Sequence, residues 1–176
     1  MPVLYVIACG GRPAADLPDF VADAQRDGWV VCVVATPDGL KFLDAGKLEA
    51  QTGFPVRSRY KQPDEPDVLP PADAFVVAPA TFNTVNKLAA GISDTLALGL
   101  LNEGIGLGRP VIAVPTPNVG LSNHPAFKAS LRTLREWGVT VVFDPASVPP
   151  LDSDPTTPPP PFPWPALVDA LRALPR

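Results

Sequence analysis

Residues 74–95 read AFVVAPATFNTVNKLAAGISDT, a short apolar run followed by an amphipathic pattern. The run at residues 74–78 lies between Asp73 and Pro79, and its length and uniform apolarity indicate a buried strand. Because proline has no N–H to donate to a β-ladder, we expect the strand to stop at Pro79. From Val85 onward apolar residues recur at helical spacing, which predicts a helix directly after the strand.

Three polar side chains, Thr81, Asn83 and Thr84, lie between this strand and this helix. Capping of the helix needs only one side-chain oxygen, from Thr81 or Asn83. Ligands of open α/β sheets bind at the carboxyl ends of the strands, which is where these side chains are expected. Two interpretations stay open on this pattern alone: helix capping, and a ligand site.

The composition is that of a globular domain. Of the 176 residues 46% are hydrophobic and 18% are charged, which suits one domain with a sizeable core. The net charge of −4 argues against a nucleic-acid partner, and no apolar run approaches the roughly 20 residues of a membrane span. Cys9 and Cys32 lie in apolar runs, which favours buried reduced thiols and a cytoplasmic protein. With a single histidine, His124, and no zinc-type spacing, we expect no metal site.

Apolar and amphipathic segments alternate along the chain. Besides residues 74–78, apolar runs predict strands at residues 3–8, 29–35, 111–114 and 139–143, and a weaker edge strand at residues 53–60. Strands that are apolar on both faces and alternate with helices are typical of a parallel sheet covered on both sides. We therefore expect an α/β protein with a three-layer, Rossmann-like (flavodoxin-like) fold and a mainly parallel sheet.

The C-terminal part differs in composition. Residues 144–165 contain ten prolines, which is typical of extended or polyproline-II chain. We divide the chain into a domain at residues 1–146 and a proline-rich tail at residues 147–176 that ends in a short helix. Two roles for the tail stay open: packing across a neighbouring subunit, and a simple tether.

Two glycines follow the first strand. Gly10 and Gly11 precede Arg12 at a strand-to-helix turn, where glycine lets the backbone approach a phosphate whose charge the helix N-terminus favours. An ordinary tight turn explains the same residues, because the spacing is neither Gly-x-Gly-x-x-Gly nor that of a P-loop.

A charged segment lies between the second and third strong strands. Arg57, Arg59 and Lys61 alternate, so all point to one side of an extended chain and either blunt a sheet edge or bind an anion. A proline- and acid-rich loop with Glu65 and Asp67 follows, which excludes a regular helix there.

These segments resemble the homo-oligomeric flavin-containing cysteine decarboxylases. That family includes phosphopantothenoylcysteine decarboxylase and enzymes that oxidatively decarboxylate peptide C-terminal cysteines. Residues 79–84, PATFNT, resemble its Pro-Ala-Ser-Ala-Asn-Thr motif, and residues 87–94 resemble Lys-Leu-Ala-x-Gly-Ile-Ala-Asp. Residues 115–126, PTPNVGLSNHPA, are similar to Pro-x-Met-Asn-x-x-Met-Trp followed by x-His-Pro-Ala, with both methionines and the tryptophan replaced.

The resemblance implies bound FMN and a homo-oligomer, a trimer or a multiple of it, with flavin at the subunit interfaces. The flavin phosphate is expected at the glycine turn, where Gly11 replaces a family serine and Arg12 supplies a charge. Phe42 fits a plain core position as an alternative. The resemblance assigns to the cofactor Gly10, Gly11, Arg12, Thr36, Phe42, Ala80, Thr81, Asn83, Thr84 and Ser93.

The resemblance also bears on catalysis. In the family, flavin oxidises a cysteine-type thiol to a thioaldehyde, which makes loss of carbon dioxide easy, and a histidine before the first motif acts as base. This chain has no histidine before His124, and the acidic loop occupies that place. Glu65 and Asp67 are therefore the candidate bases, with a solvated loop as the alternative, and Asn118 is the candidate for orienting the substrate. His124 falls at a helix start, where capping is commoner than catalysis.

Two functions of different classes follow. The first is an FMN-dependent decarboxylase or oxidoreductase that acts on a cysteine-type thiol, or on a related small-molecule or peptide substrate. The alternative is a flavin-binding regulatory or carrier protein without decarboxylase activity. A flavin prenyltransferase is a third hypothesis, although the second motif follows the cysteine decarboxylases.

Overall fold

The centre of the molecule is a parallel β-sheet. The computed structural model describes residues 1–152, 154, 156 and 158–175, and in this part of the chain the sheet has five strands in the order β2-β1-β3-β4-β5. Every paired strand runs parallel to its neighbour, which confirms the predicted α/β fold. The strands are β1 (Val3–Ala8), β2 (Val30–Ala35), β3 (Ala74–Ala80), β4 (Val111–Pro115) and β5 (Thr140–Val141).

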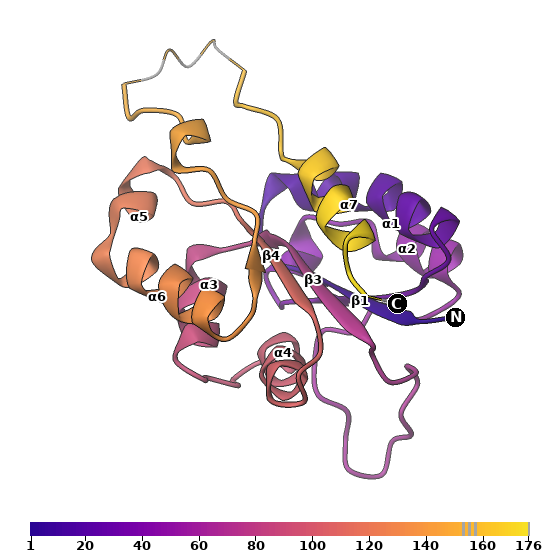
Figure 1. Ribbon diagram of the computed structural model, residues 1–176. Helices are drawn as coiled ribbons and strands as arrows, with labels where there is room; N and C mark the ends of the chain where they lie inside the picture. Colours follow the sequence, from indigo (N-terminus) through magenta and orange to yellow (C-terminus); the bar gives the residue numbers. More distant parts are fainter. Residues whose placement is uncertain (153, 155, 157, 176) are drawn as a thin grey trace.

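Helices cover both faces of this sheet (Figure 1). The α-helices in the described residues are α1 (Leu17–Arg26), α2 (Ala45–Thr52), α3 (Phe82–Ala89), α4 (Leu96–Gly106), α5 (Val119–Asn123), α6 (Pro125–Glu136) and α7 (Trp164–Arg172). Short 3-10 turns are η1 (Arg12–Asp16), η2 (Gly39–Lys41) and η3 (Pro145–Ser147).

Alternate residues of each strand serve opposite layers, as the pleat requires. In β1, Leu4 and Val6 pack in the cluster that contains the buried residues of α1, α2 and α7. Tyr5 and Ile7 pack in the other cluster, with the buried residues of α3, α4 and α6. The sheet is therefore the middle of three layers, and its continuous apolar strands follow from burial on both faces.

Two strand predictions are wrong. The strand β3 does not stop at Pro79 but continues to Ala80, with an irregularity in register after Val77. Proline lacks a donor but keeps its carbonyl, and the Pro79 oxygen accepts a hydrogen bond from the Cys9 N–H at 3.1 Å. The expected edge strand at residues 53–60 reduces to one bridge, between Arg57 and Val34.

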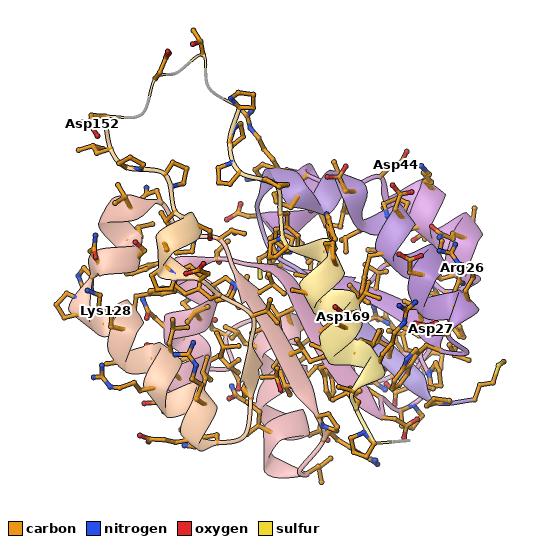
Figure 2. The ribbon with its side chains drawn as sticks, turned by 45° about the horizontal axis from the view of Figure 1, so that its top comes forward. Arg26, Asp27, Asp44, Lys128, Asp152 and Asp169 are labelled. Carbon is orange, nitrogen blue, oxygen red and sulfur yellow. The ribbon has the colours of Figure 1, made fainter. Side chains whose placement is uncertain are left out.

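The C-terminal helix α7 packs on its own chain. Leu167 and Leu171 are buried, and the Trp164 ring stacks on Phe20 of α1 with centroids 5.6 Å apart. The Arg172 Nε also donates to Asp27 Oδ2 at 2.8 Å, and Figure 2 shows α7 lying alongside α1. The predicted terminal helix is confirmed, while residues 153, 155, 157 and 176 of the tail lie outside the described part.

Within the described residues, no helix combines the length and apolarity that crossing a membrane requires. The same residues contain no cluster of three or more histidine, cysteine, aspartate or glutamate side chains arranged to hold a metal ion.

Candidate functional site

The carboxyl ends of β1, β2, β3 and β4 meet at one edge of the sheet, as parallel strands must. A cavity of about 590 Å³ lies there on the β2 side, and its lining includes Thr36, Phe42 and Thr84. A second cavity of about 430 Å³ lies on the β4 side, and its lining includes Arg12 and Phe82. We call them the β2-side cavity and the β4-side cavity. They adjoin, because both are lined by Gly10, Thr81 and Asn83.

The side chains of Thr81 and Thr84 form a hydrogen-bonded network at this edge of the sheet. Thr81 is the N-cap of α3, and its Oγ1 accepts a hydrogen bond from the Thr84 N–H at 3.2 Å. The Thr81 Oγ1 also donates to the Thr84 Oγ1 at 3.1 Å. Of the two predicted caps, Thr81 is therefore the one used, and Asn83 is left free for another role.

Asn83 and Arg12 are two polar residues of the site whose side chains are unengaged. Both side chains are exposed, and in the described part of the chain neither makes a side-chain hydrogen bond or an ion pair. Uncommitted groups at a cavity wall can contact a ligand without first breaking a bond within the protein. Asn83 borders both cavities, whereas Arg12 borders the β4-side cavity.

The glycine turn offers free backbone donors. Among the described residues, the amides of Gly10, Gly11 and Arg12 donate to no protein acceptor. A Cβ on Gly10 would lie 3.4 Å from the Phe42 ring, and one on Gly11 would lie 3.2 Å from Pro79. Side chains at either position would therefore crowd the turn, while successive free N–H groups suit an anion.

The turn after β2 lies directly on the end of β1. The Thr36 Oγ1 accepts a hydrogen bond from the Gly39 N–H at 3.0 Å, and a Cβ on Gly39 would lie only 2.2 Å from the Ala8 carbonyl oxygen. This close approach carries Phe42 to the wall of the β2-side cavity, where the side chain is 40% exposed. The plain core position considered for Phe42 is therefore wrong.

Two lysines contribute to the wall of the β2-side cavity. Lys41 and Lys87 both line it, and they pair with Asp38 and Asp94 respectively. The Lys41 ammonium group, at 2.6 Å from Asp38 Oδ1, lowers the pKa of that carboxyl through its hydrogen bond and its charge. Sequence reasoning did not identify these lysines, because a charge on a helix or turn is most often a solvated one.

Three predicted residues lie near the site but do not line the cavities. Ala80 is buried at the end of β3, beneath the capping network. Asn118 caps α5 through its Oδ1, which accepts from the Leu121 N–H at 2.9 Å, while Thr116 and Pro117 beside it line the β4-side cavity. Ser93 follows α3, is exposed, and accepts a hydrogen bond from Asn102.

The candidate bases lie elsewhere in the chain. The loop at residues 60–73 leads into the amino end of β3, on the side of the sheet away from α5 (Figure 1). The Asp67 Oδ1 pairs with the Lys61 Nζ at 3.0 Å, beside a separate cavity that includes Tyr5. The Glu65 Oε2 accepts a hydrogen bond from the Gln62 N–H at 2.9 Å. Within one chain, neither carboxylate reaches the carboxyl edge of the sheet.

The histidine takes the capping role. The His124 Nδ1 accepts a hydrogen bond from the Ala126 N–H at 3.1 Å at the start of α6. Its ring meets Phe82 edge-on, with centroids 5.5 Å apart, and Phe82 stacks in turn on Phe127. Phe82 stands within the motif but was not predicted as a site residue, since an aromatic residue on a helix is more often core.

Known proteins provide an independent comparison. The family model described as Flavoprotein matches residues 3–172. The chain is 30% identical over 148 residues to the coenzyme A biosynthesis bifunctional protein CoaBC of Mycolicibacterium smegmatis, which covers 82% of this chain and 35% of that protein. It is 26% identical over 151 residues to the probable phosphopantothenoylcysteine decarboxylase of Streptococcus mutans, with 82% and 84% covered.

A solved structure is similar as well. TvaF, an FMN-dependent cysteine decarboxylase from thioviridamide biosynthesis, superposes with a TM-score of 0.67 at 25% identity, and the match covers 84% of this chain and 93% of TvaF. The chain spans about a third or less of the length of the bifunctional coenzyme A proteins that it matches.

Proposed function

Because the chain belongs to the flavoprotein family, we propose that it binds FMN at the carboxyl edge of its sheet and oxidatively decarboxylates a cysteine-type substrate. The observation that carries this proposal is the pair of adjoining cavities that share Gly10, Thr81 and Asn83. FMN specifically is supported by the FMN-dependent TvaF, and decarboxylation by the decarboxylases among the relatives.

The residues present fit a flavin mononucleotide. The free amides of Gly10, Gly11 and Arg12, together with the unpaired Arg12 guanidinium, form a cradle suited to a phosphate dianion. The β2-side cavity combines an aromatic wall at Phe42 with the hydroxyl of Thr84, which suits a planar ring with a polar edge. Asn83 borders both cavities and would hold the cofactor where they meet.

Bound FMN supplies a two-electron oxidation of a thiol to a thioaldehyde, from which loss of carbon dioxide is easy. The chain's own residues position the reactants. Phe42 on the β2 side and Phe82 on the β4 side would exclude water from the two cavities. Arg12 attracts an anionic group, and Asn118 is proposed to orient the substrate from the turn after β4.

Glu65 and Asp67 are kept as the proposed base, with a condition set by the fold. Since their loop leaves the sheet at its amino end, a second copy of the chain would have to present the carboxylate to the cavities. This agrees with the proposal of a homo-oligomer, a trimer or a multiple of it.

The position of these carboxylates also favours the second candidate function. The described ionisable residues that line the two cavities are Arg12, Asp38, Lys41 and Lys87, and the single carboxylate among them is paired with Lys41. A flavin-binding regulatory or carrier protein needs no base, so this lining is compatible with it.

Flavin reduction by thiols separates these functions. The protein, loaded with FMN, is mixed anaerobically with peptides that end in cysteine, and the bleaching of the flavin band and release of carbon dioxide are followed. The decarboxylase proposal predicts both signals, with matched serine-ended peptides inactive. Bound FMN that no cysteine compound reduces would contradict the decarboxylase proposal and favour a flavin-binding regulatory or carrier protein.

A further inference from the structure

The Thr84 hydroxyl lies at the floor of the β2-side cavity and receives two hydrogen bonds. One comes from the Cys9 Sγ at 3.3 Å, at the end of β1, and the other from the Thr81 Oγ1 at 3.1 Å. Thr84 is only 5% exposed, yet it borders the cavity. In this arrangement neither contact uses the one hydrogen that Thr84 itself carries.

A hydroxyl has one hydrogen to donate and two lone pairs to accept with. Cys9 and Thr81 occupy both lone pairs of the Thr84 oxygen. Thr81 accepts from the Thr84 N–H at 3.2 Å and gives its own hydrogen to the Thr84 oxygen, so in this arrangement it is a donor to the Thr84 hydroxyl. The Thr84 O–H is then the remaining donor of the network, and the cavity is the open space beside it.

Cys9 is suited to remain a donor. Its side chain is 0% exposed, and its backbone N–H is held by the Pro79 carbonyl oxygen at 3.1 Å. Burial raises the pKa of the Cys9 thiol, so the sulfur keeps its hydrogen at neutral pH. Without this S–H, one lone pair of Thr84 would be free and the hydroxyl could turn its hydrogen away from the cavity.

We propose that Cys9 is a positioning residue that fixes Thr84 as a hydrogen-bond donor to the ring of the bound flavin. This inference rests on the proposed FMN site. The carbonyl oxygens and unprotonated nitrogens of a flavin ring accept hydrogen bonds, so a donor of fixed direction selects the orientation of the ring and perturbs its absorption.

The variants separate the hydrogen bond from packing. Cys9→Ala removes the donor and Cys9→Ser restores one at nearly equal volume, while Thr84→Val removes the hydroxyl that Cys9 acts on. If Cys9→Ala and Cys9→Ser do not fold, Cys9→Val and Cys9→Thr replace them. These two side chains have nearly the same shape, and only the threonine carries a hydrogen-bond donor. Cys32→Ala is the matched control, because Cys32 is the other buried cysteine and lies on β2.

The measurements are the FMN dissociation constant, by fluorescence titration of the apoprotein, and the position of the visible flavin bands. Loss of one hydrogen bond predicts a dissociation constant about fivefold higher and shifted bands for Cys9→Ala. We expect Cys9→Ser and Cys32→Ala to stay within about twofold of the parent. The double variant Cys9→Ala with Thr84→Val should equal Thr84→Val alone.

Losses of FMN affinity that add up in the double variant would overturn the role of Cys9, and so would a Cys9→Ser protein that binds FMN as weakly as Cys9→Ala. Neither result would contradict FMN binding itself. A parent protein that takes up no FMN would overturn the proposed function, and this inference with it.

Discussion

The backbone N–H of Cys9 donates to the carbonyl oxygen of Pro79 at 3.1 Å, although neither residue was predicted to pair with the other. This bond joins the glycine turn after β1 to the turn that carries Thr81 and Asn83. The free amides of the first turn and the free side chain of the second are therefore held beside the same pair of cavities.

Because Gly39 lies against the Ala8 carbonyl group, we expect one added methyl group at Gly39 to lower the stability of the protein. In Gly39→Ala the new Cβ would overlap the Ala8 carbonyl oxygen, so the turn carrying Thr36 and Phe42 must move. We expect a loss of about 1–3 kcal/mol in the free energy of unfolding, with weaker FMN binding. Urea denaturation gives the first quantity and fluorescence titration the second.

Gly46→Ala is the matched control in the neighbouring helix α2. A Cβ there would meet only Asp44 Oδ1, at 3.7 Å, so the helix should gain about 0.5–1 kcal/mol. Destabilisation of the same size in both variants would contradict the argument from close contact.

Asn83 and Asn118 are expected to serve different partners. Asn83 has no side-chain hydrogen bond in the described chain, so Asn83→Ala should leave stability unchanged and weaken FMN binding about tenfold. Asn118 caps α5, so Asn118→Ala should cost about 1 kcal/mol of stability and spare FMN. Equal loss of FMN in the two variants would refute this division of roles.

The base hypothesis predicts complementation between subunits. With FMN occupancy held constant, Glu65→Gln or Asp67→Asn should slow thiol-dependent flavin reduction about a hundredfold or more. Mixed oligomers of a base variant and Asn83→Ala should recover part of the activity, because an intact loop from one copy meets an intact cavity of another. Parental rates in both base variants from mildly acidic to mildly basic pH would exclude the carboxylates.

Stability at high pH should respond to two buried groups on the sheet. Burial raises the pKa of Tyr5 to about 12 and that of Cys32 to about 11, so the folded chain holds both protons more tightly than the unfolded chain. Their contribution is therefore complete below their ordinary pKa values and is lost as pH rises through the raised ones.

The free energy of unfolding should then fall as pH rises toward about 12. Tyr5→Phe should flatten the upper part of this decline while removing the hydrogen bond from the Tyr5 hydroxyl to the Pro70 carbonyl oxygen. Urea titrations at successive pH values give the free energy of unfolding of the parent and of Tyr5→Phe. The same decline with pH in both proteins would exclude Tyr5 as the titrating group.

The sequence predicts the sheet well because its strands are buried on both faces. Runs such as residues 74–78 are apolar throughout, and the carboxyl ends of parallel strands necessarily share one edge. Gly10, Thr36 and Thr81 are distant in sequence, but each follows a strand, and the structure brings them to the same cavity at this edge.

Other features depend on contacts that no local pattern carries. The continuation of β3 past Pro79 involves the Cys9 N–H and the pairing of Ala80 with β4. The docking of α7 involves Phe20 of α1 and Asp27 at the end of that helix. The acidic loop lies at the amino end of the sheet because it leads into β3, and the charges of the loop do not indicate this. The sequence indicates only a buried thiol at Cys9, because Thr84, which Cys9 contacts, is 75 residues away along the chain.

The most direct test of the account is the identity of the flavin that the protein binds. The protein is purified, denatured, and its extract examined for the flavin absorption bands, with the released compound identified by mass; apoprotein is titrated with FMN and NAD in parallel. We predict release of FMN, or uptake of added FMN but not of NAD. A colourless protein that fails to take up FMN would contradict it.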